Sequence, residues 1–248
     1  MRRLLVLGLV GLLVACGRDA PPTSTATAPA VTSDSARPNS GELRRDKLSP
    51  RIVFLGDSLT AGLGLSADRS FPALIGKRLK DNGLDYDVIN AGVSGDTSAG
   101  GLRRLDWSLE GDVRVLIVAL GANDGLRGLP PDDMKKNIAA VLERADARDI
   151  PVILAGMEAP PNNGVDYTNA FRAVYTDLAR QYEVRFIPFL LQGVAGAVSL
   201  NQADGIHPND RGAEIVADLV WAELEPALRR PKDQGPAHPR TLAPAHRK

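Results

Sequence analysis

The sequence contains very little cysteine and no excess of charge of either sign. Its single cysteine, Cys16, cannot form an intramolecular disulfide or supply a cysteine-rich metal site, so the fold has to depend on packing. Thirty lysines and arginines balance thirty aspartates and glutamates among the 248 residues. This balance lacks the basic surface with which proteins gather nucleic acid, and we expect no nucleic-acid partner.

Long apolar runs are also missing, apart from one stretch near the N-terminus. Residues 4–15 follow Arg2 and Arg3 and are too few for a spanning helix of ~20 residues, which is typical of a signal peptide. Residues 13–16, LVAC, resemble a bacterial lipobox, in which cleavage leaves Cys16 as the lipidated first residue. Residues 1–16 therefore predict an exported, membrane-anchored lipoprotein facing the periplasm or the outside. The alternative is a soluble periplasmic or secreted protein.

Two further segments lack the branched and aromatic residues of a folded core. Residues 17–48 are rich in proline, serine, threonine and alanine, and we expect them to form a disordered tether. Residues 231–248 have the same character and predict a disordered tail. Residues 51–230 lie between them and have the length of a single domain.

Within this domain, short apolar segments alternate with longer amphipathic ones. Strands buried on both faces are expected at residues 52–55, 88–89, 113–120, 151–155 and 184–187. Apolar residues three and four positions apart predict helices at residues 71–81, 132–148, 168–182 and 212–228. The alternation predicts an α/β fold, a three-layer α/β/α sandwich around a mainly parallel five-stranded sheet. In such a fold, active-site groups collect beyond the carboxyl ends of the strands.

A serine stands at the carboxyl end of the first predicted strand. Ser58 follows Gly56 and Asp57, and the small residues after it leave room for a substrate. Aspartate and serine at this place also commonly cap the next helix, so position alone does not decide the role of Ser58. The GxSxG motif of α/β-hydrolases is absent, because Thr60 occupies the position of its second glycine.

A serine nucleophile needs a base, usually a histidine that a carboxylate holds in one tautomer. Two of the three histidines, His238 and His246, lie in the predicted tail, which leaves His207 as the imidazole of the domain. Asp204 precedes it by three residues, and a tight turn at Gly205 would direct the carboxylate toward the ring. The sequence thus offers one candidate pair to activate Ser58.

Acyl transfer also needs donors where negative charge develops on the carbonyl oxygen. Residues 90–98 follow the second predicted strand, and their glycines allow backbone N–H groups to approach a ligand. Residues 121–125 follow the third, and Asn123 there can present a carboxamide N–H. Each segment read alone is also ordinary turn chemistry.

Four motifs together resemble the SGNH, or GDSL, hydrolase family: GDSLTAGLG, GVSGDTS, GANDGLRG and DGIHPN. The likeness extends over most of residues 51–228 and is greatest to bacterial periplasmic thioesterase, lysophospholipase and arylesterase members. The resemblance implies a serine ester hydrolase with Ser58 as nucleophile and with Asp204 and His207 completing a triad. It also implies an oxyanion hole formed by the Ser58 N–H, the Gly95 N–H and the Asn123 side chain.

The expected substrate is an acyl ester or thioester, either a small molecule or a lipid, with membrane contact through the N-terminal anchor and with no cofactor or metal. Two alternatives stay open: a carbohydrate acetylesterase or acyltransferase on the same scaffold, and a non-catalytic lipoprotein that binds acyl chains or glycans. A third, metal-assisted hydrolysis, is disfavoured because the chain has no HExxH motif or histidine cluster. Its ligands would be Asp57, Asp124, Asp204 and His207.

Several apolar residues flank the motifs and either line an acyl-binding groove or close the core. They are Leu63, Leu65, Leu126, Met157 and Pro160.

Overall fold

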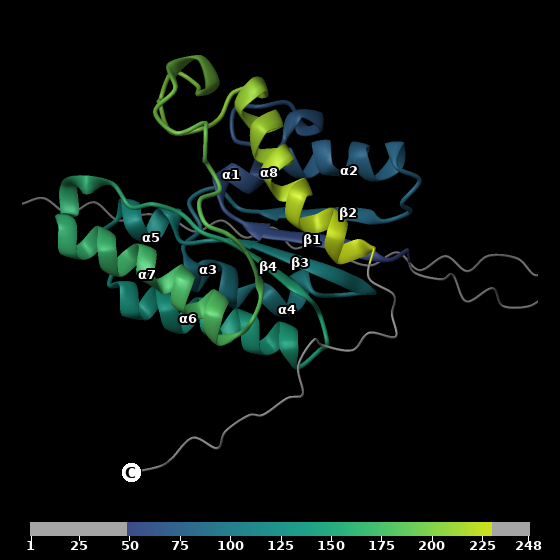
Figure 1. Cartoon of the computed structure of the whole chain (residues 1–248), viewed down its shortest axis with the longest axis horizontal. Helices are drawn as coiled ribbons and strands as arrows, with labels where there is room; N and C mark the ends of the chain where they lie inside the picture. Colours follow the sequence, from purple (N-terminus) through teal and green to yellow (C-terminus); the bar gives the residue numbers. More distant parts are fainter. Residues whose placement is uncertain (1–48, 230–248) are drawn as a thin grey trace, which may run out of the picture. The chain divides into compact units, whose positions relative to one another are not determined.

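The computed structural model describes residues 49–229, which fold around one parallel sheet (Figure 1). The strands are β1 (Arg51–Gly56), β2 (Asp87–Gly92), β3 (Val113–Ala119), β4 (Val152–Ala155) and β5 (Arg185–Ile187). Their order in the sheet is β2-β1-β3-β4-β5, and every neighbouring pair is parallel. This is the order of a doubly wound fold, in which the loops after β1 and β3 meet at the switch point. The predicted five-stranded α/β sandwich is confirmed, with a wholly parallel sheet.

The central strands are apolar beyond their first residues, because helices cover both of their faces there. Residues 52–55 of β1 and 116–118 of β3 have no exposed surface, and all four residues of β4 are buried. The edge strands β2 and β5 are only partly buried. A parallel sheet with two covered faces requires this pattern, so the continuous apolar runs identified the core strands correctly.

Helices lie on both faces of the sheet (Figure 1). One layer contains α1 (Ser58–Ala61), α2 (Phe71–Asp81) and α8 (Asp210–Leu228), and the other contains α3 (Ser98–Arg103), α4 (Leu105–Ser108), α6 (Pro131–Asp146) and α7 (Val165–Gln181). Helix α5 (Ala122–Leu126) follows β3. Short 3-10 helices occupy η1 (Ala67–Arg69), η2 (Pro161–Asn163) and η3 (Val198–Leu200).

The four long helices agree with the predicted segments to within three residues at each end. In α2, Phe71, Ile75 and Leu79 are buried at intervals of four, which places one stripe of the helix against the sheet. The short helices α1, α3, α4 and α5 were not predicted, because four to six residues are too few to show a helical period.

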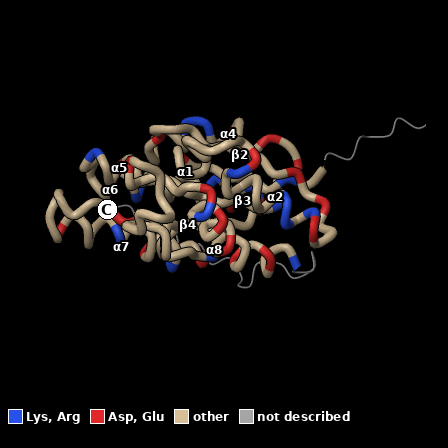
Figure 2. Tube along the Cα trace, turned by 90° about the horizontal axis from the view of Figure 1, so that it is seen from above, with Lys and Arg blue, Asp and Glu red and all other residues tan. Residues whose placement is uncertain are grey.

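Acidic and basic residues are interspersed along the chain, as Figure 2 shows. The ion pair between Arg78 and Asp218 joins α2 to α8, and Arg69 forms a second pair with Glu214. Such surface pairs contribute little to stability individually, so the fold depends mainly on its apolar core.

The predicted signal peptide, Cys16, the tether and the C-terminal tail lie outside the described residues. Between residues 49 and 229, none of the helices combines the length and the apolar character needed to cross a membrane.

Candidate active site

Ser58, His207 and Asp204 form one hydrogen-bonded chain at the carboxyl end of the sheet. Ser58 is the first residue of α1 and is separated from β1 only by Asp57, and its Oγ lies 2.9 Å from His207 Nε2. His207 lies in the loop before α8, and its Nδ1 is 2.7 Å from Asp204 Oδ2. Both distances suit hydrogen bonds. The structure thus brings together three residues that the sequence separates by up to 149 positions.

A turn at Gly205 holds Asp204 against the imidazole. Gly205 has a φ of +71°, a conformation that other residues adopt only with strain. Asp204 Oδ1 accepts hydrogen bonds from the backbone N–H groups of Ile206 and His207, at 2.9 and 3.0 Å. Hydrogen bonds from the His207 backbone and side chain and from Ile206 lower the pKa of Asp204 to about 2. The carboxylate therefore accepts from Nδ1–H, and this tautomer leaves Nε2 free to accept from the Ser58 hydroxyl.

Gln202 joins the histidine loop to the serine loop. Its side-chain Nε2 donates to the carbonyl oxygens of Leu63 and Pro208, at 2.7 and 2.9 Å, and its backbone N–H donates to the His207 carbonyl at 2.8 Å. These bonds fix the separation between the two halves of the site. Sequence reasoning missed Gln202, because a single glutamine near a motif carries no signal of its partners.

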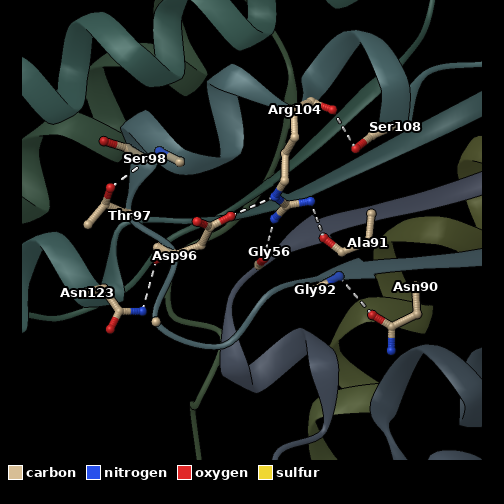
Figure 3. Close-up of polar contacts among 12 residues, drawn as sticks. Gly56, Asn90, Ala91, Gly92, Asp96, Thr97, Ser98, Arg104, Ser108 and Asn123 are labelled. Atoms are coloured by element: carbon tan, nitrogen blue, oxygen red, sulfur yellow. Dashed lines mark hydrogen bonds and ion pairs between the residues drawn. The ribbon is translucent and has the colours of Figure 1, made fainter. Parts of the chain in front are cut away.

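The loop after β2 and the segment after β3 are in direct contact. Asn123 Nδ2 donates to the backbone carbonyl of Asp96 at 3.0 Å, as Figure 3 shows. Gly95 precedes Asp96 and has a φ of +83°, and its carbonyl accepts from Arg127 at 2.8 Å. Asn123 lies in the first turn of α5 rather than in an open loop, which corrects the sequence interpretation. The short helix fixes its backbone and so limits the directions of its amide.

A hydrogen bond links the same loop to the end of β1, the strand that precedes Ser58. The N–H of Val93 donates to the carbonyl of Gly56 at 3.0 Å, and Gly56 stands two residues before Ser58. The expected donors Gly95 and Asn123 therefore belong to segments that are anchored beside the end of β1.

A buried network behind Asn123 was not expected from the sequence. Asp124 is 3% exposed and accepts from the backbone N–H and the Oγ of Ser98, at 2.7 and 2.6 Å. Asn137 of α6 donates to Ser98 Oγ at 3.0 Å. These bonds satisfy a buried carboxylate and tie the start of α3 to α5. Ser98 lies inside the GVSGDTS motif, so the motif carries a structural contact beside its glycines.

Asp57 combines a helix-capping role with nearly complete burial. Its Oδ1 accepts from the Leu59 N–H at 3.0 Å, which caps α1 as the alternative sequence interpretation expected. Its Oδ2 is buried without a hydrogen-bond partner among the described residues. Burial raises the pKa of Asp57 to about 6.

An apolar crevice adjoins Ser58 and His207. Its lining includes Leu59, Leu63, Leu65, Phe71, Leu191 and Val216. Two of the five residues expected to flank a groove, Leu63 and Leu65, lie there.

The other three lie elsewhere. Met157 is buried in the core beside Asp57, Leu126 is 48% exposed, and Pro160 is partly buried. Residues 49–229 also contain no group of three or more His, Cys, Asp or Glu side chains that could hold a metal ion. The four residues of the metal-assisted alternative are therefore not gathered into one site.

Comparisons with known proteins agree with this geometry. Residues 54–215 match the GDSL-like lipase/acylhydrolase family, a span that contains Ser58, Gly95, Asn123, Asp204 and His207. The esterase TesA of Pseudomonas aeruginosa is 42% identical over 187 residues, which cover 75% of this chain and 93% of TesA. The thioesterase 1/protease 1/lysophospholipase L1 of Escherichia coli K12 is 36% identical over 178 residues, covering 71% of this chain and 84% of that protein. The crystal structure of the psychrotrophic esterase EstA from Pseudoalteromonas, inhibited by monoethylphosphonate, is 32% identical with a TM-score of 0.69, covering 73% of this chain and 99% of EstA.

Proposed function

The chain belongs to the GDSL-like lipase/acylhydrolase family and is a serine ester hydrolase, and we propose that Ser58, His207 and Asp204 are its catalytic triad. His207 Nε2 takes the hydroxyl proton as Ser58 Oγ attacks the ester carbonyl. The protonated imidazole then gives that proton to the departing alcohol or thiol. Water, deprotonated by the same nitrogen, attacks the acyl-enzyme, releases the acid and restores Ser58.

Asp204 orients His207 and stabilises its positive charge in both steps. The single observation that carries the proposal is the unbroken chain from Ser58 Oγ through His207 to Asp204, at 2.9 and 2.7 Å. A serine that merely capped a helix would not require an imidazole and an ionised carboxylate in line behind it.

The proposed oxyanion hole consists of the Ser58 N–H, the Gly95 N–H and one N–H of the Asn123 amide. Asn123 Nδ2 has two hydrogens, and the bond to the Asp96 carbonyl uses one of them. The second hydrogen is available to donate a hydrogen bond to the negatively charged oxygen of the tetrahedral intermediate. Because the first hydrogen is bonded to the Asp96 carbonyl, the amide is held in one orientation before the substrate arrives. Electrostatic stabilisation requires such a fixed orientation.

The experiment that tests the triad is hydrolysis of p-nitrophenyl esters by wild-type protein and by Ser58→Ala. We expect turnover to fall by several orders of magnitude, because an enzyme that has lost its triad nucleophile accelerates the reaction only about 10³-fold to 10⁴-fold over the rate in water. Ser66→Ala, at an exposed serine in the same connection, is the matched control and should keep wild-type turnover. Undiminished hydrolysis by Ser58→Ala, or labelling of that variant by a fluorophosphonate, would refute the assignment.

The apolar crevice beside Ser58 supports an ester or thioester with an apolar acyl or leaving group as substrate, rather than an acetylated sugar. The names of the relatives include esterase, arylesterase, thioesterase and lysophospholipase, which fits this class. Turnover of a series of acyl-chain lengths, run beside acetylated sugars, measures the preference. Faster turnover of the sugars would favour the acetylesterase alternative.

We further propose that Cys16 is lipidated and that residues 17–48 connect it to a catalytic domain beyond the cytoplasm. The proposal is supported by the LVAC sequence after a short apolar run. Labelled palmitate should be incorporated into the protein in cells that express the full chain, and not into the Cys16→Ser variant. Incorporation that survives this change would contradict it.

A further inference from the structure

Arg104 lies where α3 meets α4 and directs its guanidinium toward the ends of two strands. Its Nη1 donates to the carbonyl of Ala91 at 2.6 Å, and its Nη2 donates to the carbonyl of Gly56 at 2.7 Å (Figure 3). Its Nε donates to Asp96 Oδ2 at 2.6 Å in an ion pair. One planar group thus connects β1, β2 and the loop after β2.

Two of these three contacts, those with Gly56 and Asp96, bear directly on parts of the proposed site. Gly56 precedes Ser58 by two residues. Asp96 follows Gly95 directly, and its backbone carbonyl accepts from Asn123 Nδ2 at 3.0 Å. The segments that carry the nucleophile and two oxyanion donors therefore share one cationic anchor, although the guanidinium touches none of the donors.

The burial of the pair makes this anchor stiff. The side chain of Arg104 is 18% exposed and that of Asp96 is 16% exposed, the lowest values for any Arg–Asp or Arg–Glu pair among the described residues. Three nitrogens of a rigid plane are fixed at once, so the guanidinium cannot turn without losing hydrogen bonds. Lysine offers one nitrogen on a flexible stem and cannot reproduce that fork.

We propose that Arg104, through its ion pair with Asp96, is a positioning residue of the oxyanion hole. It holds the turn at Gly95 and Asp96 so that the Gly95 N–H and the Asn123 amide converge on the carbonyl oxygen bound at Ser58. The inference rests on the proposed function, because it needs Gly95 and Asn123 to be the donors. It gives Arg104 no part in proton transfer.

The test is a double-mutant cycle on kcat for a p-nitrophenyl ester, with Arg104→Lys, Asn123→Ala and the double variant. Displacement of a hydrogen-bond donor by up to about 1 Å can lower the catalytic rate by up to about 10²-fold. Arg104→Lys should therefore lower kcat by about 10-fold to 100-fold. KM should change by less than about threefold, because the donors act mainly on the transition state. In the Asn123→Ala background the loss should be at least about threefold smaller, since one of the two positioned donors is already gone.

Two further variants separate positioning from general stability. Asp96→Asn keeps the backbone carbonyl that Asn123 uses but removes the charge that pairs with Arg104, and it should lower kcat in the same direction. Arg185→Lys is the control, because Arg185 pairs with Glu223 at the next most shielded arginine–carboxylate pair of the described residues, with side chains 27% and 35% exposed. It should leave kcat unchanged. Urea unfolding of every variant verifies that the protein is folded at the assay temperature.

Equal fold-losses in the two backgrounds, or a rise in KM with unchanged kcat, would overturn the inference. A folded Asp96→Asn variant with wild-type kcat would do the same. These outcomes are distinct from a failure of the proposed function, which would appear as undiminished activity of Ser58→Ala.

Discussion

Replacement of Asp57 by asparagine should stabilise the protein at neutral pH. The gain in stability should shrink as the pH falls. Asp57 is 1% exposed and borders a small crevice that is lined by apolar residues from the ends of β3 and β4 and from the segment after β4, including Ala119, Ala155 and Met157. Its Oδ2 has no hydrogen-bond partner among the described residues, so little offsets the loss of hydration of the charge. The asparagine side chain would keep an oxygen to accept from the Leu59 N–H and would carry no charge.

The magnitude follows from the raised pKa. An increase from 3.8 to about 6, at about 1.4 kcal/mol per pH unit, corresponds to about 3 kcal/mol of stability lost when Asp57 is ionised in the folded protein. Between these two values the folded state binds the proton more tightly than the unfolded state, so stability falls as pH rises. The contribution of Asp57 to stability is fully present below pH 3.8 and is lost as the pH rises through about 6.

The assay is urea unfolding of wild-type protein and Asp57→Asn across about pH 4 to pH 7.5. Linkage predicts a stability difference that grows by about 2.4 kcal/mol in favour of the variant over this range, whatever constant offset the amide introduces. Asp68→Asn is the control of opposite sign, because hydrogen bonding from Ser66 lowers the pKa of Asp68, which is fully exposed. Parallel stability curves for wild-type protein and Asp57→Asn would refute the reasoning, since they would give Asp57 the same pKa in both states.

Two other substitutions test separate parts of the site. Asp204→Asn should lower kcat by about 10³-fold to 10⁴-fold, because His207 would lose the acceptor that fixes its tautomer, and p-nitrophenyl ester kinetics with kcat above a tenth of wild type would contradict this role. The pKa of Asp204 is about 2, so its ionisation should not shape the pH–rate profile above about pH 4. Ser98→Ala should destabilise the protein by about 1.5 to 3 kcal/mol in urea unfolding, because it removes a 2.6 Å donor from the buried carboxylate of Asp124. Thr176→Ala, at an exposed hydroxyl, should change stability by less than about 0.5 kcal/mol and is its control.

The sheet could be predicted from the sequence because burial on both faces leaves a local trace. Residues 52–55 and 116–118 are apolar without interruption, and the long helices repeat their apolar residues every three or four positions. Edge strand β2 extends from Asp87 to Gly92, well beyond the predicted residues 88–89, because an edge strand needs fewer apolar side chains. At β2, composition therefore identifies only the part of the strand that carries branched apolar side chains.

The three residues of the proposed triad could be selected from the sequence for a different reason, which is the scarcity of histidine. The domain holds one histidine, and a carboxylate lies three residues before it, so few arrangements could activate a serine. Asn123 was a candidate donor because it follows the third predicted strand, and the resemblance of four motifs to a known family singled out Gly95 among the glycines after the second. Neither route reveals the contacts of Gln202 and Arg104, because most of these contacts end on backbone carbonyls.

Arg104 illustrates this limit. Two of its three acceptors are backbone carbonyls, those of Ala91 and Gly56, at separations of 13 and 48 residues. Every residue has such a carbonyl, so no pattern of side chains in the sequence distinguishes the two that the guanidinium binds. Only the parallel pairing of β1 with β2, which sets Gly56 opposite Gly92, brings the two strand ends within reach of one plane. The same pairing places the Gly95 loop beside Ser58, so the register of the sheet determines both the site and the residue that we propose holds it.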